Sequence, residues 1–221
     1  MILGVKLMIT IYLTRHGQTQ WNLNKRLQGW KNSPLTELGI SQAEALRDRL
    51  KDMELDIIYT SPIERAYKTA EIIRGDKKIE IVKNDGLKEL NYGEWEGSTI
   101  EEIEKNPMYN EQLDNLFNHP KEYIPFGGET YEHLIERIDD TMNKILEKNK
   151  DKKVLIVTHG MTLKALIHYF NENMTIDDIV KLPVMGQTSL TQIDVVDGKY
   201  NLVLQNDTSH YEDNHRVQVG W

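Results

Sequence analysis

The chain has 221 residues, of which 39% are hydrophobic and 28% are charged, and its formal net charge is −8. This length suits one large α/β domain or two small ones with a substantial core, and the acidic balance argues against a general nucleic-acid-binding protein, whose surface is usually basic. Because the sequence contains no cysteine, disulfides, thiolate catalysis and cysteine-based metal sites are excluded.

The sequence opens with an apolar segment, MILGVKLMITIYL, that is too short to span a bilayer and lacks the small-residue cleavage site of a signal peptide. Its β-branched and aromatic residues predict a buried strand over residues 8–14. Met8 is an alternative start of translation, with residues 1–7 as an extension before the strand. Because no other apolar run is long enough to cross a membrane, the expected location is the cytoplasm, without a membrane partner.

Helices and strands are expected to alternate after this first strand. Residues 36–51 (TELGISQAEALRDRLK) place apolar side chains at helical spacing, and Thr36 precedes them as a suitable N-cap. Residues 56–60 (DIIYT) and 79–83 (IEIVK) have the β-branched content of short strands. Such alternation indicates a mainly parallel sheet that is covered by helices on both faces.

A further helix is predicted directly after the strand at residues 56–60. Ser61 and Glu64 have the spacing of a capping box, and Pro62 falls at the position expected for the first helical residue. This start places Arg65 in the first turn of a capped helix, close to the end of the preceding strand.

The middle of the chain is predicted to leave the sheet. Residues 84–98 form a loop that carries Glu89, and residues 99–126 hold one or two short helices interrupted by three prolines. We call residues 96–126 the cap, and we expect this insertion to determine substrate selectivity. A long helix follows at residues 129–149, and its buried stripe consists of Leu134, Ile138, Met142 and Ile145.

The last part of the chain returns to the sheet. Residues 154–158 (VLIVT) are predicted as a buried strand, residues 161–170 as a helix, and residues 187–194 and 200–206 as a hairpin. No internal repeat, low-complexity tract or linker divides the sequence. We therefore expect one α/β domain over residues 1–221, with the cap embedded in it.

Three of the predicted strands end in segments that carry basic or imidazole side chains. The segments are LTRHG at 13–17, TSPIERA at 60–66 and VTHG at 157–160. Ligands of open α/β sheets bind at the carboxyl ends of the strands, so these segments are expected to converge at one edge. Taken alone, each side chain is more often structural than catalytic, because isolated motifs have many false positives.

The combination of these side chains fits phosphoryl transfer. A phosphoryl group in transfer spreads negative charge over its equatorial oxygens, and arginine offers fixed positive charge in a fork geometry. A neutral imidazole can attack phosphorus, and a carboxylic acid such as Glu89 can protonate the leaving oxygen. Two arginines, two histidines and a glutamate supply these parts without a metal or another cofactor.

The motifs resemble the histidine phosphatase superfamily, also called the phosphoglycerate mutase-like family, from about Ile9 to His210. The similarity is strongest over residues 13–46, which begin LTRHGQTQWN. The family's RHG, TSPxxRAxxTA, ExxxGxWEG and THG motifs fall in order on Arg15-His16-Gly17, Arg65, Glu89 and His159. The resemblance implies a three-layer α/β/α sandwich. The tail at residues 211–221 departs from the family pattern and has no assigned role.

The resemblance also implies roles for individual residues. His16 is the nucleophile that becomes phosphorylated, and Glu89 is the acid that protonates the leaving oxygen and later activates water. The residues expected to hold the phosphoryl group are Arg15, Arg65 and His159, with a further hydrogen bond from Asn22. Additional substrate contacts are expected at Gln28, Gly29 and Gly160. No metal and no cofactor are expected.

Other functions remain as alternatives. A phosphoglycerate mutase would use the same phosphohistidine but return the phosphoryl group to another oxygen of its substrate. A phosphate-binding or regulatory module would need neither the nucleophile nor the acid. A metallohydrolase would use His16, His159 and Glu89 as ligands, but two flanking arginines would repel the cation. The expected partner is a small phosphorylated metabolite, and the oligomeric state is left open, with a homodimer as one alternative.

A shortage of cations favours a phosphatase over a mutase. The family's mutases carry Glu-Arg-His-Tyr-Gly around the acid and a paired-arginine segment in the cap, whereas Leu90 follows the acid here. Between residues 99 and 126 the only lysine or arginine residues are Lys105 and Lys121. A substrate carboxylate that is buried without a partner is costly. Cations from elsewhere, such as Lys25 or Arg26, are the alternative source of charge.

Overall fold

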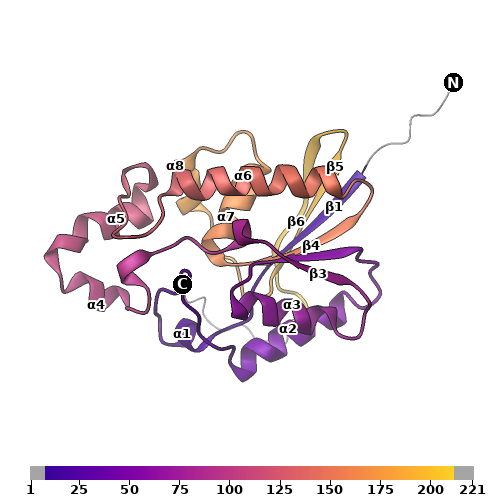
Figure 1. Cartoon of the computed structure of the whole chain (residues 1–221), viewed down its shortest axis with the longest axis horizontal. Helices are drawn as coiled ribbons and strands as arrows, with labels where there is room; N and C mark the ends of the chain where they lie inside the picture. Colours follow the sequence, from indigo (N-terminus) through magenta and orange to yellow (C-terminus); the bar gives the residue numbers. More distant parts are fainter. Residues whose placement is uncertain (1–7, 212–221) are drawn as a thin grey trace.

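The structure is a computed structural model that describes residues 8–211. Residues 1–7, which were expected to be an extension, and residues 212–221 of the tail lie outside the described residues. The organisation of residues 1–221 as one domain therefore stays a prediction. At the centre is a six-stranded sheet with the order β3-β2-β4-β1-β5-β6 (Figure 1). Its strands are β1 (Met8–Arg15), β2 (Ile57–Thr60), β3 (Glu80–Lys83), β4 (Lys153–Thr158), β5 (Leu190–Val196) and β6 (Lys199–Asp207).

The sheet is mainly parallel, as the sequence predicts. β1, β4, β2 and β3 pair in parallel, and within the six described strands β5 pairs antiparallel with β1 and β6. The central parallel strands are buried on both faces, which explains the near-continuous apolar runs in their sequences. In β4, for example, Val154 and Ile156 pack into the core on one side of the sheet, and Leu155 and Val157 pack on the other.

Helices cover both faces of the sheet and complete the expected three-layer sandwich (Figure 1). On one face lie α6 (Tyr131–Lys148) and α7 (Gly160–Tyr169), and all four stripe residues predicted for the long helix are buried there. On the other face lie α2 (Glu37–Arg49) and α3 (Glu64–Arg74). Within the described part of the chain, no helix is long and apolar enough to cross a membrane.

The cap lies at one end of the molecule, beside α8 and the start of α6 (Figure 1). It contains α4 (Ile100–Glu104) and α5 (Asn110–Asn118), in agreement with the one or two short helices expected. The buried Trp95 ring holds the cap together, because the rings of Tyr109, Tyr123 and Phe126 lie with their centroids 5.7, 6.0 and 5.8 Å from it. Single-turn 3₁₀ helices occur at Asp85–Leu87, Gly93–Trp95, Pro107–Tyr109 and Pro120–Glu122.

The predicted capping box at the start of α3 is wrong. The helix begins at Glu64, so Ser61 and Pro62 both precede it, and the N-cap residue offers no side-chain hydrogen bond. The Ser61 hydroxyl instead accepts a hydrogen bond within the turn before the helix. The N–H of Arg65 donates to Oδ1 of Asn32 at 3.2 Å, so a distant loop supplies the cap that the local pattern assigned to serine.

Two short helices escape the sequence prediction. α1 (Gln20–Leu23) and α8 (Ile176–Lys181) each have too few residues for apolar periodicity to show. Both nevertheless begin with a capping box, formed by Thr19 and Asn22 in α1 and by Thr175 and Asp178 in α8. That spacing is visible in the sequence and is the signal that predicts such helices.

The loop that carries His16 packs tightly against α2. A Cβ atom added to Gly17 would lie 2.3 Å from the carbonyl oxygen of Gly39, and one added to Gly39 would lie 2.0 Å from that of Gln18. Both positions therefore require glycine. The N–H of Gly17 also donates to Oγ1 of Thr69 at 3.1 Å, so α2 and α3 together fix the backbone beside His16.

Replacing Gly39 by alanine is expected to displace this loop, because the new methyl group would overlap the Gln18 backbone. Overpacking of this kind typically costs about 1–3 kcal/mol, and we expect the free energy of unfolding to fall by that amount in urea titrations. The control is Glu44→Ala, at an exposed position of the same helix, which should stay within about 0.5 kcal/mol of the parent. Unchanged stability of Gly39→Ala would contradict the close packing.

Candidate active site

The carboxyl ends of β1 and β4 bring the two predicted histidines together. Arg15, the last residue of β1, is in register with Thr158, the last residue of β4. The N–H of His16 donates to the carbonyl oxygen of Thr158 at 2.9 Å and so extends the pairing by one residue. As a result, the rings of His16 and His159 meet edge to face, with their centroids 5.2 Å apart.

Hydrogen bonds define the tautomer of His16. Its Nδ1 atom lies 2.7 Å from the carbonyl oxygen of Gly17, and because a carbonyl oxygen only accepts, Nδ1 carries the proton. Nε2 therefore presents a lone pair, and the Nε–H group of Arg65 donates to it at 3.2 Å. This arrangement directs the nucleophilic nitrogen toward the place where the guanidinium can hold an anion.

Burial keeps His16 neutral between two positive charges. Arg15, His16 and Arg65 are each no more than 2% exposed. Burial, and after it the charges of Arg65 and Arg15, hold the pKa of His16 well below its usual value. Burial also lowers the pKa of Arg65 to about 10, which leaves this side chain charged at neutral pH.

His159 has two unsatisfied ring nitrogens in this site. The side chain is fully buried, and neither Nδ1 nor Nε2 has a hydrogen-bond partner among the described residues. Burial, followed by the charge of Arg65, holds its pKa well below the usual value, so the ring is neutral. Because buried polar atoms are rarely left unpaired, the ring beside His16 marks a position for a ligand oxygen.

Glu89 is held at the N-terminus of α7. Its Oε1 accepts from the N–H groups of Leu90 and Thr162 at 2.9 and 3.0 Å, and its Oε2 accepts from the N–H of Met161 at 3.2 Å. The Thr162 hydroxyl adds a bond of 3.2 Å to Oε1. These donors fix the position and orientation of the carboxyl group at the start of α7.

Two cavities meet at Glu89. The smaller, of about 20 Å³, has room for roughly one water molecule, so a phosphoryl group requires side chains to move apart. The larger, of about 390 Å³, lies between α5, α7 and α8. The residues that line both are Arg15, Glu89 and Tyr92, whereas His16 and Arg65 line only the smaller. Glu89 is therefore placed between the nucleophile and the space available to the rest of an ester.

The other expected substrate contacts differ in their placement. Gln28 and Gly29 line the smaller cavity. Gly160 lines the larger one, where an added Cβ would have ordinary contacts of 3.6 Å or more, so this position does not require glycine. Asn22 lines neither cavity; its Oδ1 accepts from the N–H and the hydroxyl of Thr19, at 3.1 and 2.9 Å, within the capping box of α1. The structure therefore gives Asn22 a capping role, and its contact with a phosphoryl group stays a prediction.

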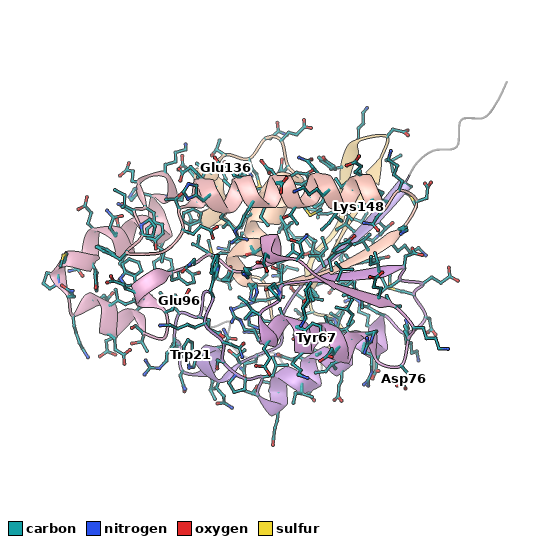
Figure 2. All side chains as sticks on the ribbon, viewed as in Figure 1. Trp21, Tyr67, Asp76, Glu96, Glu136 and Lys148 are labelled. Carbon is teal, nitrogen blue, oxygen red and sulfur yellow. The ribbon has the colours of Figure 1, made fainter. Side chains whose placement is uncertain are left out.

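Glu96, a buried carboxylate at the base of the cap, shapes the loop around Arg65 (Figure 2). It accepts from the N–H groups of Trp30 at 2.7 Å and Lys31 at 2.9 Å. The loop offers its own carbonyl oxygens to Arg65, with Gly29 O and Lys31 O at 2.7 and 2.6 Å from the guanidinium. The position of Glu96 in the WEG part of the ExxxGxWEG motif was the only sequence signal for this role.

Arg137 of α6 holds the segment that carries Glu89, and no sequence motif revealed it. Its guanidinium forms a two-pronged ion pair with Glu129, with N–O distances of 2.6 and 2.8 Å. It also donates to the carbonyl oxygens of Gly86, Lys88 and Glu89 at 2.8, 2.8 and 2.9 Å. One partly buried charge therefore fixes the backbone that positions the acid.

A set of metal ligands is missing from this site. Within residues 8–211, no group of three or more histidine, aspartate or glutamate side chains is arranged to hold a metal ion. His16 and His159 lie beside two guanidiniums, whose charge opposes that of a cation. The metallohydrolase alternative therefore finds no ligand cluster in this part of the chain.

Comparison with known proteins identifies the family. The family model of the histidine phosphatase superfamily (branch 1) matches residues 11–208. The chain belongs to this superfamily. The match spans nearly all of the sheet, the cap and both histidine loops, so it confirms the resemblance carried by the sequence motifs.

The relatives of this chain include proteins named as phosphatases and proteins named as mutases. It is 34% identical over 203 residues to the uncharacterized phosphatase PhoE of Bacillus subtilis, covering 92% of this chain and 97% of that protein. It is 32% identical over 197 residues to the phosphoglycerate mutase of Schizosaccharomyces pombe, covering 86% and 92%. The solved structure of YhfR from Bacillus stearothermophilus has a TM-score of 0.88 and 40% identity, covering 92% of this chain and all of that one. By name, the sequence relatives divide between a phosphatase and a mutase.

The two buried histidines make the stability of the protein depend on pH. Their pKa values in the folded state lie well below the unfolded value of about 6.5, so the unfolded chain binds more protons in acid. Their contribution is therefore fully present above about pH 6.5 and is lost as the pH falls below it. Each histidine contributes at most about 1.4 kcal/mol per pH unit to this loss.

We expect His159→Gln to flatten the dependence of the unfolding free energy on pH between about pH 6.5 and 5, because one of the two buried groups is removed. Urea titrations at several pH values measure this slope. His133→Gln, at an exposed position of α6, is the matched control and should keep the parental slope. Identical slopes for His159→Gln and the parent would show that the His159 ring is not held neutral by burial.

Proposed function

We propose that this protein is a phosphatase that hydrolyses a phosphate monoester of a small metabolite through a phosphohistidine on His16. The observation that carries the proposal is the position of Glu89 between two cavities. One cavity contains the His16 ring and two guanidiniums, and the other has room for the alcohol part of an ester. An ester with its phosphoryl group beside His16 and the arginines and its alcohol part in the larger cavity would therefore place its leaving oxygen near Glu89.

The first half-reaction transfers the phosphoryl group to the protein. Nε2 of His16 forms a bond to phosphorus while the ester P–O bond breaks, and Glu89 gives its proton to the leaving oxygen. Arg15, Arg65 and His159 stabilise the charge on the equatorial oxygens. For this attack Arg65 must release Nε2 of His16 and direct the same N–H group to a phosphoryl oxygen.

The second half-reaction transfers the group to water. The ionised Glu89 removes a proton from water, whose oxygen attacks phosphorus while the N–P bond breaks. His16 returns to its neutral form, and inorganic phosphate leaves. The N–H groups at the N-terminus of α7 hold the carboxyl group in place for this step. The arginines supply the positive charge at the phosphoryl group, so we propose that no metal takes part.

The walls of the larger cavity support hydrolysis over mutase activity. The lysines of the cap, Lys105 and Lys121, form ion pairs with exposed acidic residues, and Arg26 also pairs with an acidic residue. A mutase must hold a multiply charged intermediate while it reorients. Besides Arg15, the larger cavity contains a single lysine or arginine, Lys164, which the count of cap cations from the sequence missed.

Replacing Glu89 by glutamine removes the proton donor and keeps the size of the side chain. We expect phosphate release from an alkyl phosphate to fall roughly 10²- to 10⁴-fold. The loss should be much smaller for p-nitrophenyl phosphate, whose leaving group scarcely needs a proton. Glu94→Gln, at an exposed position of the same segment, is the control and should affect neither substrate. Equal losses on both substrates would assign Glu89 a purely structural role.

The choice between phosphatase and mutase is tested with 3-phosphoglycerate and a trace of 2,3-bisphosphoglycerate. Free phosphate and 2-phosphoglycerate are followed together after addition of the purified protein. We expect phosphate release to exceed isomerisation, because the apolar cavity retains the charged intermediate poorly and water reaches the phosphohistidine. Rapid formation of 2-phosphoglycerate with little free phosphate would refute the phosphatase proposal.

A further inference from the structure

Lys164 of α7 is a buried cation for which the proposed reaction has no use. It lines the larger cavity and is 7% exposed, although lysine is among the residues least often buried. Its only hydrogen bond among the described residues is a long one of 3.5 Å from Nζ to the carbonyl oxygen of Val180, and no ion pair in this part of the chain includes it. An ammonium group has three donors, so most of its bonding capacity is unused.

The surroundings of Lys164 make this charge costly. The nearby walls of the cavity are largely apolar, with side chains from α5, α7, α8 and the segment after α8. The apolar lining includes Leu116, Phe117, Met161, Val180, Leu182 and Val184. Burial lowers the pKa of Lys164 to about 8, so the group still carries its proton at neutral pH. A buried charge is normally paired, and no ion pair in the described part of the chain includes Lys164; Glu89, which lines the same cavity, acts on it only through its charge.

We propose that Lys164 binds a carboxylate on the alcohol part of the substrate, so that the preferred phosphate monoesters combine an apolar body with one carboxylate. That the ligand is a substrate rests on the proposed phosphatase function, whereas binding of a carboxylate at Lys164 does not depend on turnover. Lys164 lines the larger cavity and not the smaller, whereas His16 does the reverse, so Lys164 lies away from the attacked phosphorus.

The charge balance of the cavity favours a carboxylate over a second phosphate group. Arg15 also lines the larger cavity, but it adjoins the phosphoryl site and is assigned to the phosphoryl oxygens. One ammonium group then remains for the far part of the ligand. It matches a single negative charge, whereas a phosphate dianion would leave a second charge buried without a partner.

The test uses non-hydrolysable phosphonates, so that binding is measured without turnover. Two series with two to six methylene groups are compared by calorimetry: n-alkylphosphonates and the matching ω-carboxyalkylphosphonates. At the best chain length, we expect the parent to bind the carboxylate compound about tenfold more tightly than its alkyl counterpart, as for one charge-assisted contact. Lys164→Met should abolish this preference, and Lys164→Arg should retain part of it. Lys144→Met, at an exposed position of α6, is the control and should keep the parental ratio.

Every outcome decides the assignment. A parent without carboxylate preference at any length, or the same preference in Lys164→Met, would overturn it. If Lys164→Met does not fold, as judged by thermal unfolding, Lys164→Gln takes its place. Its preference for the carboxylate compound is then compared with that of the parent. Phosphate release from the corresponding alkyl phosphates and ω-carboxyalkyl phosphates is measured separately. If the protein prefers the carboxylate compounds but releases no phosphate, the phosphatase function is refuted and the Lys164 site is kept. If it releases phosphate but shows no carboxylate preference, the Lys164 site is refuted and the phosphatase function is kept.

Discussion

The contact between the guanidinium of Arg65 and Nε2 of His16 is the interaction on which the site depends. A guanidinium buried to this degree is tolerated only when its donors are used, and here two loop carbonyl oxygens and the imidazole accept from it. The imidazole can accept only as the neutral tautomer with the proton on Nδ1, which Gly17 O fixes. The burial of Arg65 therefore depends on His16 being neutral, because only the neutral ring can accept its hydrogen bond.

Residues outside the site maintain this arrangement. Glu96 shapes the loop whose carbonyl oxygens face Arg65, Arg137 fixes the segment that carries Glu89, and Gly39 allows α2 to approach the His16 loop. Each chemically important loop is thus held by a contact from a different part of the chain. The smaller cavity is almost closed and Nε2 of His16 accepts from Arg65, so attack on phosphorus requires this hydrogen bond to be broken.

The sequence predicts the parts of the molecule that depend on local patterns and on parallel topology. Apolar runs predicted the strands. Because parallel strands end at one edge of the sheet, they also predicted that Arg15, His16 and His159 converge there. Contacts between segments that are distant in the sequence could not be predicted from local patterns. The cap of α3 comes from Asn32 instead of Ser61, and the amide of Asn22 serves the start of α1. Lys164 resembles any helical lysine in sequence, since only the packing of the cap and α8 around α7 buries it.

The most direct test of the account is to trap the phosphorylated protein. A radiolabelled phosphate ester is mixed with the protein, the reaction is quenched in alkali within milliseconds to seconds, and the labelled peptide is identified by mass spectrometry. The account predicts acid-labile, alkali-stable label on His16, a stoichiometry approaching one per chain when water attack is slow, and none in His16→Ala. The absence of covalent label in a protein that turns over substrate, or an unchanged rate in His16→Ala, would contradict it.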